Sequence, residues 1–276
     1  MPEKIYIQWF RQDLRLADNP ALSHAAESGS VIPVYILDQV HVGDHRPGGA
    51  SRWWLHHSLK ALDESLQGNL NVFRGDPKQI LQSLFEKHRA SGIFWNRCYE
   101  SWSRNRDASI KQFFKEKGVE AESFNGSLLW EPMEVLKSDD TPYRVFTPFF
   151  RNACLNAPPP REPLPVPKNL SLLKSELSES VESLGLLPKV PWDRKIEPHW
   201  RVSEKGGQEK MLEFFEKGLM HYKEGRNFPA KSYVSRLSPY LHQGQISSNQ
   251  AWYGGLDKHS GKNLDHFLSQ LVWREF

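Results

Sequence analysis

The first 124 residues alternate short apolar segments with amphipathic ones, and this alternation limits the possible folds more than any other feature of the sequence. Apolar runs of strand length occupy 4–10, 31–37, 71–75, 92–96 and 119–124. Segments with helical spacing of apolar residues lie between them, at 18–27, 51–66, 77–90 and 106–117. Strands that alternate with helices favour right-handed crossovers and a parallel sheet. We therefore predict an α/β fold, with an open, Rossmann-like parallel sheet and helices on both of its faces.

The composition divides the chain into three parts. Residues 1–130 carry the alternation, and 131–200 form a connector that is Pro-rich from 157, with eight of the 19 prolines between 158 and 191. Helical spacing of apolar residues then returns at 208–219, 246–255 and 262–276. We predict an α/β domain over 1–130, followed by the start of an all-helical domain over 201–276. The last helix reaches Phe276 without a cap, so we expect a C-terminally truncated chain.

Ligands of open parallel sheets bind outside the carboxyl ends of the strands. A site in the α/β part is therefore expected in the loops that follow Phe10, Leu37, Gly75 and Asn96. These loops contain polar and charged residues, whereas the predicted strands are apolar. The sequence thus predicts a polar cleft at one edge of the sheet.

Two helix starts are predicted from capping residues. Asp18 precedes Pro20 and is expected to cap the helix over 18–27. Ser238 precedes Pro239 and is expected to cap a second helix, whose free amides would face an anion with Arg236 beside it. The SRLSP segment thus predicts an anion site in the helical part, and a capped surface helix is the alternative.

Composition and motifs exclude several classes of protein. The net charge is only +3, and no apolar run approaches the roughly 20 residues that cross a bilayer. We therefore expect a cytoplasmic protein with no membrane partner. Cys98 and Cys154 have the spacing of neither a metal site nor a disulfide framework, and no metal is expected. The motifs of nucleotide-binding loops, serine hydrolases and metalloproteases are missing, which indicates that a cofactor carries any reaction.

A longer motif begins at Trp9 and reads WFRxDLRLxDNPAL. From the residues alone its alternating charges would form an ion-paired loop at the rim of the sheet. The motif resembles the opening signature of the DNA photolyases and cryptochromes. The similarity continues through the segments VYILD, SRWWL, RGDP, WNRCYE, PYRVFTPFF, SRLSPYL and WREF.

This resemblance implies an antenna domain, followed by a helical domain that holds FAD and uses blue light to drive electron transfer. Repairing members of the family split pyrimidine dimers in DNA. The positions that correspond to the FAD-binding residues of the family are Tyr222, Ser235, Arg236, Leu237, Ser238 and Arg274.

The resemblance also assigns residues to a damaged base. Trp273 corresponds to the side chain that stacks on a flipped lesion, and Gln270 to one that faces the substrate. Members that repair cyclobutane dimers commonly carry Glu at the position of Gln270, whereas some cryptochromes and (6-4) repair enzymes carry Gln. The type of lesion, and the choice between repair and signalling, therefore stay open.

For the antenna pigment, the resemblance favours 8-hydroxy-5-deazaflavin over methenyltetrahydrofolate. Trp102 and Ser103 replace the Asn-Glu pair that is typical of the folate-binding branch. For Ile36, Leu37, Asp38 and Arg52, the alternative role is packing at strand ends and charge at a helix start. The antenna-binding positions implied are Ile36, Leu37, Asp38, Arg52, Glu100, Arg104, Arg106 and Asp107.

The leading hypothesis is a light-driven lyase that splits pyrimidine dimers in DNA by electron transfer from photoexcited reduced FAD, with FAD and not a side chain as the catalyst. Its expected partner is damaged DNA with the dimer flipped out, and the protein is expected to be a monomer. The alternatives are a cryptochrome-type blue-light photoreceptor and an inactive fragment. Since the helical domain is expected to be incomplete, we expect weak binding of FAD or none.

Overall fold

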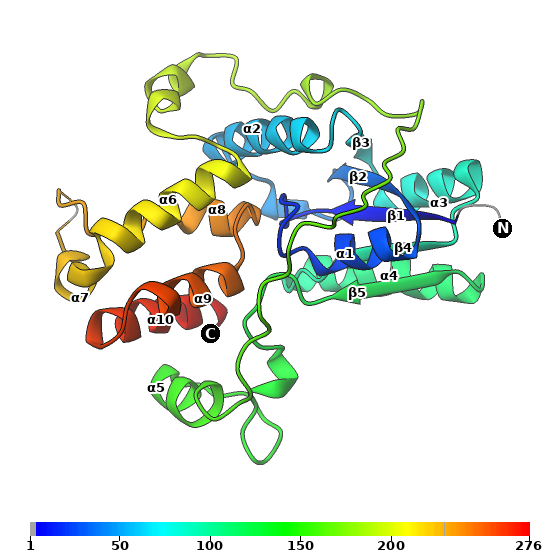
Figure 1. Ribbon diagram of the computed structural model, residues 1–276. Helices are drawn as coiled ribbons and strands as arrows, with labels where there is room; N and C mark the ends of the chain where they lie inside the picture. The colour runs from blue at the N-terminus through cyan, green and yellow to red at the C-terminus, as the bar shows by residue number, and fades with distance from the viewer. Residues whose placement is uncertain (1–3, 229) are drawn as a thin grey trace.

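The computed structural model describes residues 4–228 and 230–276, and its first half is built on a five-stranded sheet (Figure 1). All neighbouring strands pair in parallel, in the order β3-β2-β1-β4-β5. The strands are β1 (Ile5–Phe10), β2 (Ser30–Asp38), β3 (Asn71–Gly75), β4 (Gly92–Asn96) and β5 (Glu120–Phe124). The predicted open parallel sheet is confirmed. The strand order reverses between β1 and β4, which opens a crevice at their carboxyl ends.

Helices cover both faces of this sheet. On one face, α1 (Pro20–Ser28) and α2 (Gly49–Ser65) pack with Tyr6 and Val31 in one apolar core. On the other face, α3 (Pro77–His88) and α4 (Ser101–Glu116) pack with Ile7 and Ile32 in a second core. Successive residues of a strand point to opposite faces of the sheet, so the side chains of Tyr6 and Ile7 lie in different cores. Burial on both faces explains why the strand sequences are continuously apolar.

The prediction that Asp18 caps α1 is wrong. The N-cap is Asn19, whose side-chain Oδ1 accepts a hydrogen bond from the amide of Leu22 at 3.1 Å. Asp18 instead has a left-handed backbone with φ of 52°. Its carboxylate accepts a hydrogen bond from the amide of Leu164 at 2.9 Å and pairs with Arg161 at 2.6 Å. Asp18 therefore fastens the connector to the α/β part.

The connector between the two parts consists of irregular backbone and short helical turns. Single bridges attach it to the sheet, between Val31 and Leu172 and between Val72 and Glu179. It passes along the sheet before it reaches the helical part (Figure 1). Its short elements are η2 (Pro132–Glu134), α5 (Phe146–Pro148), the π-helical turn η3 (Phe149–Cys154), η4 (Glu182–Leu184), η5 (Trp192–Lys195) and η6 (Glu197–His199).

The helical part lies at the carboxyl ends of the strands (Figure 1). Its elements are α6 (Glu204–Lys217), η7 (Leu219–His221), α7 (Tyr222–Gly225), α8 (Ser238–Gln243), α9 (Ser248–Lys258) and α10 (Lys262–Glu275). Phe214, Phe215 and Phe267 lie in its core, with ring centroids 5.2 to 5.9 Å apart. The predicted all-helical start of a second region is confirmed.

A tight backbone contact joins the two parts. The amide of Leu14, after β1, donates to the carbonyl of Gln243 at 3.1 Å, and Arg15 donates to the carbonyl of Gly244 at 2.9 Å. Gly244 has φ of 68°, and a Cβ atom there would lie 2.0 Å from the carbonyl oxygen of Gln12. Only glycine fits this position, because the conformation and the close approach both exclude a side chain.

Candidate functional site

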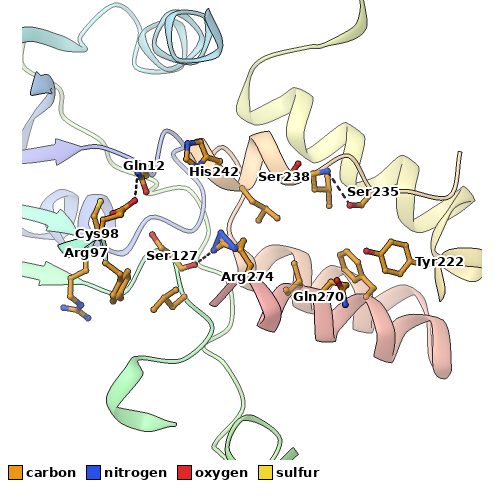
Figure 2. A pocket seen from close by; sticks show the side chains of 17 residues that line it. Gln12, Arg97, Cys98, Ser127, Tyr222, Ser235, Ser238, His242, Gln270 and Arg274 are labelled. Carbon is orange, nitrogen blue, oxygen red and sulfur yellow. Dashed lines mark hydrogen bonds between the residues drawn. The ribbon is translucent and has the colours of Figure 1, made fainter. Parts of the chain in front are cut away.

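The helical part and the sheet edge enclose a cavity of about 650 Å³. It brings together side chains from the loops after β1 and β4 with side chains from α7, α8 and α10 (Figure 2). Its lining includes six of the residues that the resemblance assigns to FAD or to the lesion, namely Tyr222, Ser235, Leu237, Ser238, Gln270 and Arg274. Segments about 50 residues apart in sequence therefore face one space.

Tyr222 is held at one end of this cavity by aromatic packing. Its ring lies 5.4 Å from that of Phe214 and 5.6 Å from that of Phe267, both edge-to-face. The guanidinium of Arg226 lies 5.7 Å from the same ring. Burial raises the pKa of the Tyr222 phenol above its usual value, although Arg226 acts in the opposite direction. The phenol therefore stays protonated and can donate a hydrogen bond into the cavity.

The segment before α8 and the first residue of this helix each supply one hydroxyl group to the cavity. The prediction that Ser238 caps a helix is wrong, because Ser238 is the first residue of α8 and Leu237 precedes it without a side-chain cap. The apolar side chain of Leu237 is buried, and the Ser235 hydroxyl accepts a hydrogen bond from its amide at 3.5 Å. The Ser235 and Ser238 hydroxyls, not a capped helix end, are the polar groups available for an anion.

Arg274 extends from α10 along the wall of the same cavity. Its Nη2 donates to the carbonyl of Ser127 at 2.9 Å (Figure 2). The same atom donates to the hydroxyl of Ser248 at 2.8 Å. The next residue, Glu275, accepts hydrogen bonds from the amide of Leu129 at 2.9 and 3.0 Å. Burial raises the pKa of Glu275 to about 7. The end of α10 is therefore tied to the segment after β5 through two adjacent side chains.

A second cavity of about 310 Å³ lies at the carboxyl ends of β1, β2 and β4. This is the crevice that the reversal of strand order opens, and it lies in the loops predicted from the sequence. Five of the residues implied for an antenna line it, namely Ile36, Leu37, Asp38, Glu100 and Arg106.

Linked ion pairs connect three charged residues that line the second cavity, namely Arg11, Asp38 and Arg106. Arg106 contacts Asp38 at 3.1 Å and Asp107 at 2.7 Å, and Asp107 also pairs with Arg11. Burial acts to raise the pKa of Asp38, but the amides of His41 and Val40 and the guanidinium of Arg106 outweigh it, so the pKa is lowered. Asp38 is thus a fixed anion at the rim of the cavity.

The two cavities share one wall. Gln12, Cys98, Glu100 and His242 line both of them. Gln12 Nε2 donates to Oε1 of Glu100 at 3.0 Å (Figure 2). Sequence reasoning had selected only Glu100 of these four. The loops after Phe10 and Asn96 contained the signal for Gln12 and Cys98, whereas His242 comes from a helix whose position depends on tertiary packing.

The structure places five of the sequence-derived site residues outside these two cavities. Arg236 has a left-handed backbone with φ of 53° and is exposed. Arg52 bonds to the carbonyl of Gly185 in the connector. Arg104 lines a third cavity of about 420 Å³. Asp107 lines this third cavity as well and reaches the second cavity only through its ion pairs with Arg11 and Arg106.

The fifth of these residues, Trp273, stacks on a connector residue. Its ring lies 3.8 Å from the ring of Phe146, with an interplanar angle of 12°. Phe276 meets both rings edge-on, at 5.7 and 5.8 Å. Trp273 remains half exposed. The role of Trp273 toward a damaged base stays a prediction.

Among residues 4–228 and 230–276, no group of three His, Cys, Asp or Glu side chains is placed to hold a metal ion. Within these ranges no helix is both long and apolar enough to cross a membrane. Both cysteines are free thiols.

Comparison with known proteins places these observations in a family. The DNA photolyase family model matches residues 6–168. A deoxyribodipyrimidine photo-lyase from Agrobacterium fabrum is 40% identical over 98% of this chain and 57% of its own length. Cryptochrome-2 from Arabidopsis thaliana is 30% identical over 99% of this chain and 48% of its own length.

The fold gives the same result. The crystal structure of a bacterial class III photolyase from Agrobacterium tumefaciens superposes with a TM-score of 0.93 at 38% identity, over 100% of this chain and 58% of that one. The chain thus spans about half to three-fifths of the length of these relatives. Since the family model covers more than half of the sequence, the chain belongs to the DNA photolyase family.

Proposed function

We propose that this chain is the light-harvesting and flavin-facing part of a DNA photolyase, which splits pyrimidine dimers by electron transfer from photoexcited reduced FAD. The observation that carries the proposal is the first cavity, because it is lined both by Tyr222, Ser235 and Ser238 and by Gln270 and Arg274 of α10. Two sets of residues that a flavin and a flipped base would need therefore face one space.

The residues present fit an FAD molecule. A volume of about 650 Å³ lies in the usual range of cofactor sites. The hydroxyls of Ser235 and Ser238 and the guanidinium of Arg274 are donors suited to phosphate oxygens. The rings of Tyr222 and Phe267 offer apolar surface for a flat ring system. FAD, when bound, supplies the absorption of light and the transferred electron.

The chain's own residues would bind the cofactor and the damaged base and orient them. Ser235 and Ser238 would hold the phosphates, and Leu237 would exclude water from them, since its side chain is 1% exposed. Arg274 is kept extended by its bonds to Ser127 and Ser248. Gln270 would present an amide to a damaged base. Trp273 would stack on that base only after separating from Phe146, because the two rings are now in contact.

The second cavity is the proposed site of an antenna pigment. Asp38, Glu100 and Arg106 offer polar groups, and Ile36 and Leu55 offer apolar ones. This mixture suits a planar heterocycle with polar edges. Of the two pigments considered, 8-hydroxy-5-deazaflavin remains the proposal. Because the cavities share a wall, energy absorbed in one would be passed over a short distance to the other.

The remaining assignments are proposals of the same kind. We also propose three regions, with boundaries at 1–130, 131–200 and 201–276. The proposed location is cytoplasmic, and the proposed state is a monomer. Because the chain spans only 57% of its Agrobacterium relative, FAD is expected to bind weakly or not at all to these 276 residues. A stoichiometric yellow flavin in the purified chain would contradict this expectation.

An absorption and repair experiment tests the proposal. The chain is supplemented by the part of a relative's helical domain that it does not span, and it is incubated separately with FAD and with 8-hydroxy-5-deazaflavin. Each bound pigment is quantified by its spectrum. We expect Ser235→Ala with Ser238→Ala to weaken binding of FAD without affecting the deazaflavin. Ser109→Ala, at an exposed position of α4, is the matched control. If the double variant binds both pigments as well as the unmodified protein does, the assignment of the first cavity is refuted.

The alternative function is a cryptochrome-type photoreceptor, and one residue favours it. Gln270 lines the cavity at the position where many dimer-repairing members carry Glu. Dimers in DNA are counted after illumination with blue light and after the same time in darkness, with the chain supplemented by the part of a relative's helical domain that it does not span. Loss of dimers only in the light supports repair. Bound, photoreduced flavin without loss of dimers supports the photoreceptor.

A further inference from the structure

Trp9, near the end of β1, is fully buried and does not itself line the second cavity. The guanidinium carbon of Arg11 lies over its ring at 4.6 Å from the centroid, and that of Arg106 at 4.7 Å. Both arginines line the second cavity. One indole thus lies in contact with two cations that themselves face the proposed pigment site.

A second indole is covered in the same way. Trp102 lines the second cavity directly, and the guanidinium carbon of Arg106 lies 5.0 Å from its ring centroid. Asp107 holds the arrangement in place, because it pairs with both Arg11 and Arg106. Arg106 is buried, so water screens its charge little. Asp38 and Asp107 pair with it and offset part of this charge, but the guanidinium is the group that lies over the two rings.

These contacts bear on what happens to an excited pigment. An indole can transfer one electron to an excited flavin-type ring, which forms an indole radical cation and a pigment radical anion. Return of the electron restores both partners, and the excitation energy is lost as heat. A positive charge fixed against the indole opposes the first step, because it repels the positive charge that the indole would acquire.

We propose that Arg11 and Arg106 keep Trp9 hard to oxidise, and thereby prevent it from quenching an excited pigment in the second cavity. The inference rests on the proposed antenna function and extends it, since an excitation must survive before it can be passed on. Arg11 and Arg106 then act through Trp9, in addition to any contact with the pigment. The same reasoning covers Trp102 through Arg106.

Fluorescence of a bound probe tests this inference. The full chain is loaded with 8-hydroxy-5-deazaflavin, and the lifetime of its emission is measured at saturation. In Arg11→Met we expect a lifetime shortened at least about twofold, since one of the two cations over Trp9 is removed. Arg11→Lys retains the charge and should keep most of the lifetime. Arg194→Met, at an exposed position of η5 away from the three cavities, is the matched control.

Removal of the indole distinguishes quenching from a structural effect. In the double variant Arg11→Met with Trp9→Phe, the lifetime should return to that of the unmodified chain. A lifetime that stays short in the double variant would overturn the inference. Trp9→Phe alone should leave the lifetime unchanged, and this variant decides the question if Arg11→Met does not fold. A longer lifetime in Trp9→Phe would mean that Trp9 already quenches, against the inference.

An experiment without pigment separates this inference from the antenna proposal. The chain is oxidised with azide radicals, and the yield of oxidised Trp9 is measured by mass spectrometry of its peptides. We expect this yield to rise several-fold in Arg11→Met and to stay low in Arg11→Lys. An unchanged yield overturns the inference. Failure of the probe to bind, with a rising yield of oxidised Trp9, refutes the antenna proposal alone.

Discussion

Gln12 and Glu100 are joined across the wall between the two cavities, with Nε2 of Gln12 donating to Oε1 of Glu100 at 3.0 Å. The two residues belong to the loops after β1 and β4, which the reversal of strand order brings to the same crevice. Each residue also faces both cavities. A change in the side chain of either one therefore alters two sites at once.

Replacement of Glu100 by Gln is expected to weaken binding of 8-hydroxy-5-deazaflavin about three- to tenfold, by loss of one charged acceptor in the second cavity. Titration of the probe's fluorescence measures the dissociation constant. Glu116→Gln, at the exposed end of α4, should leave the constant unchanged. Equal affinities for all three proteins would exclude a role for Glu100 in this cavity.

Stability should depend on pH through Glu275. Burial raises its pKa in the folded protein from 4.5 to about 7, so the folded state favours the protonated form. The contribution of Glu275 to the free energy of unfolding is fully present below pH 4.5 and is lost as the pH rises through 7. The free energy of unfolding falls by at most about 3 kcal/mol over this range. Urea unfolding at pH 5 and pH 8 measures this loss. Glu275→Gln should abolish most of the difference, whereas Glu216→Gln, exposed on α6, should preserve it.

The link between Asp18 and the connector predicts a large effect of a single substitution. The Asp18 side chain is completely buried, and Asp18→Ala leaves Arg161 and the amide of Leu164 without this partner. We expect the free energy of unfolding to fall by about 3 kcal/mol. Chemical denaturation gives the value, and Asp44→Ala, at an exposed site, is the control. A loss below 1 kcal/mol, an ordinary surface effect, would contradict the role given to this pair.

The stack of Phe146 on Trp273 predicts both a stability and a fluorescence change. Phe146→Ala removes a ring 3.8 Å from the indole, and we expect a loss of about 1 kcal/mol together with easier quenching of Trp273 by acrylamide. Val145→Ala, next to it and 60% exposed, should change neither quantity. Unaltered quenching in Phe146→Ala would mean that the stack does not persist in solution.

The sheet and its order of elements followed from the sequence because buried parallel strands are apolar along their whole length, as in 31–37. The first residue of a helix was harder to predict than the sheet. Asp18 and Asn19 are both good caps, and only the left-handed backbone of Asp18 decides between them. At Ser238 the pattern of Ser before Pro suggested a cap, but the helix begins at the serine itself.

The sheet edge that carries the second cavity could be predicted from the order of strands and helices, whereas the direction of individual side chains could not. Arg104 and Arg106 were both assigned to the antenna, yet residues two apart on a helix point in different directions. Because α4 begins at Ser101, five residues before the predicted start, this difference was hidden in the sequence. Trp273 shows the same limit, since its stacking partner lies 127 positions away in the connector.

Gly244 determines how closely the helical part approaches the sheet. Its backbone lies directly against that of Gln12, with no room for even a methyl group. The helical part therefore sits at a separation from the sheet that is fixed by main-chain atoms. A larger residue at this one position would act as a wedge between the two parts, and both cavities would widen, because side chains from both parts line each of them.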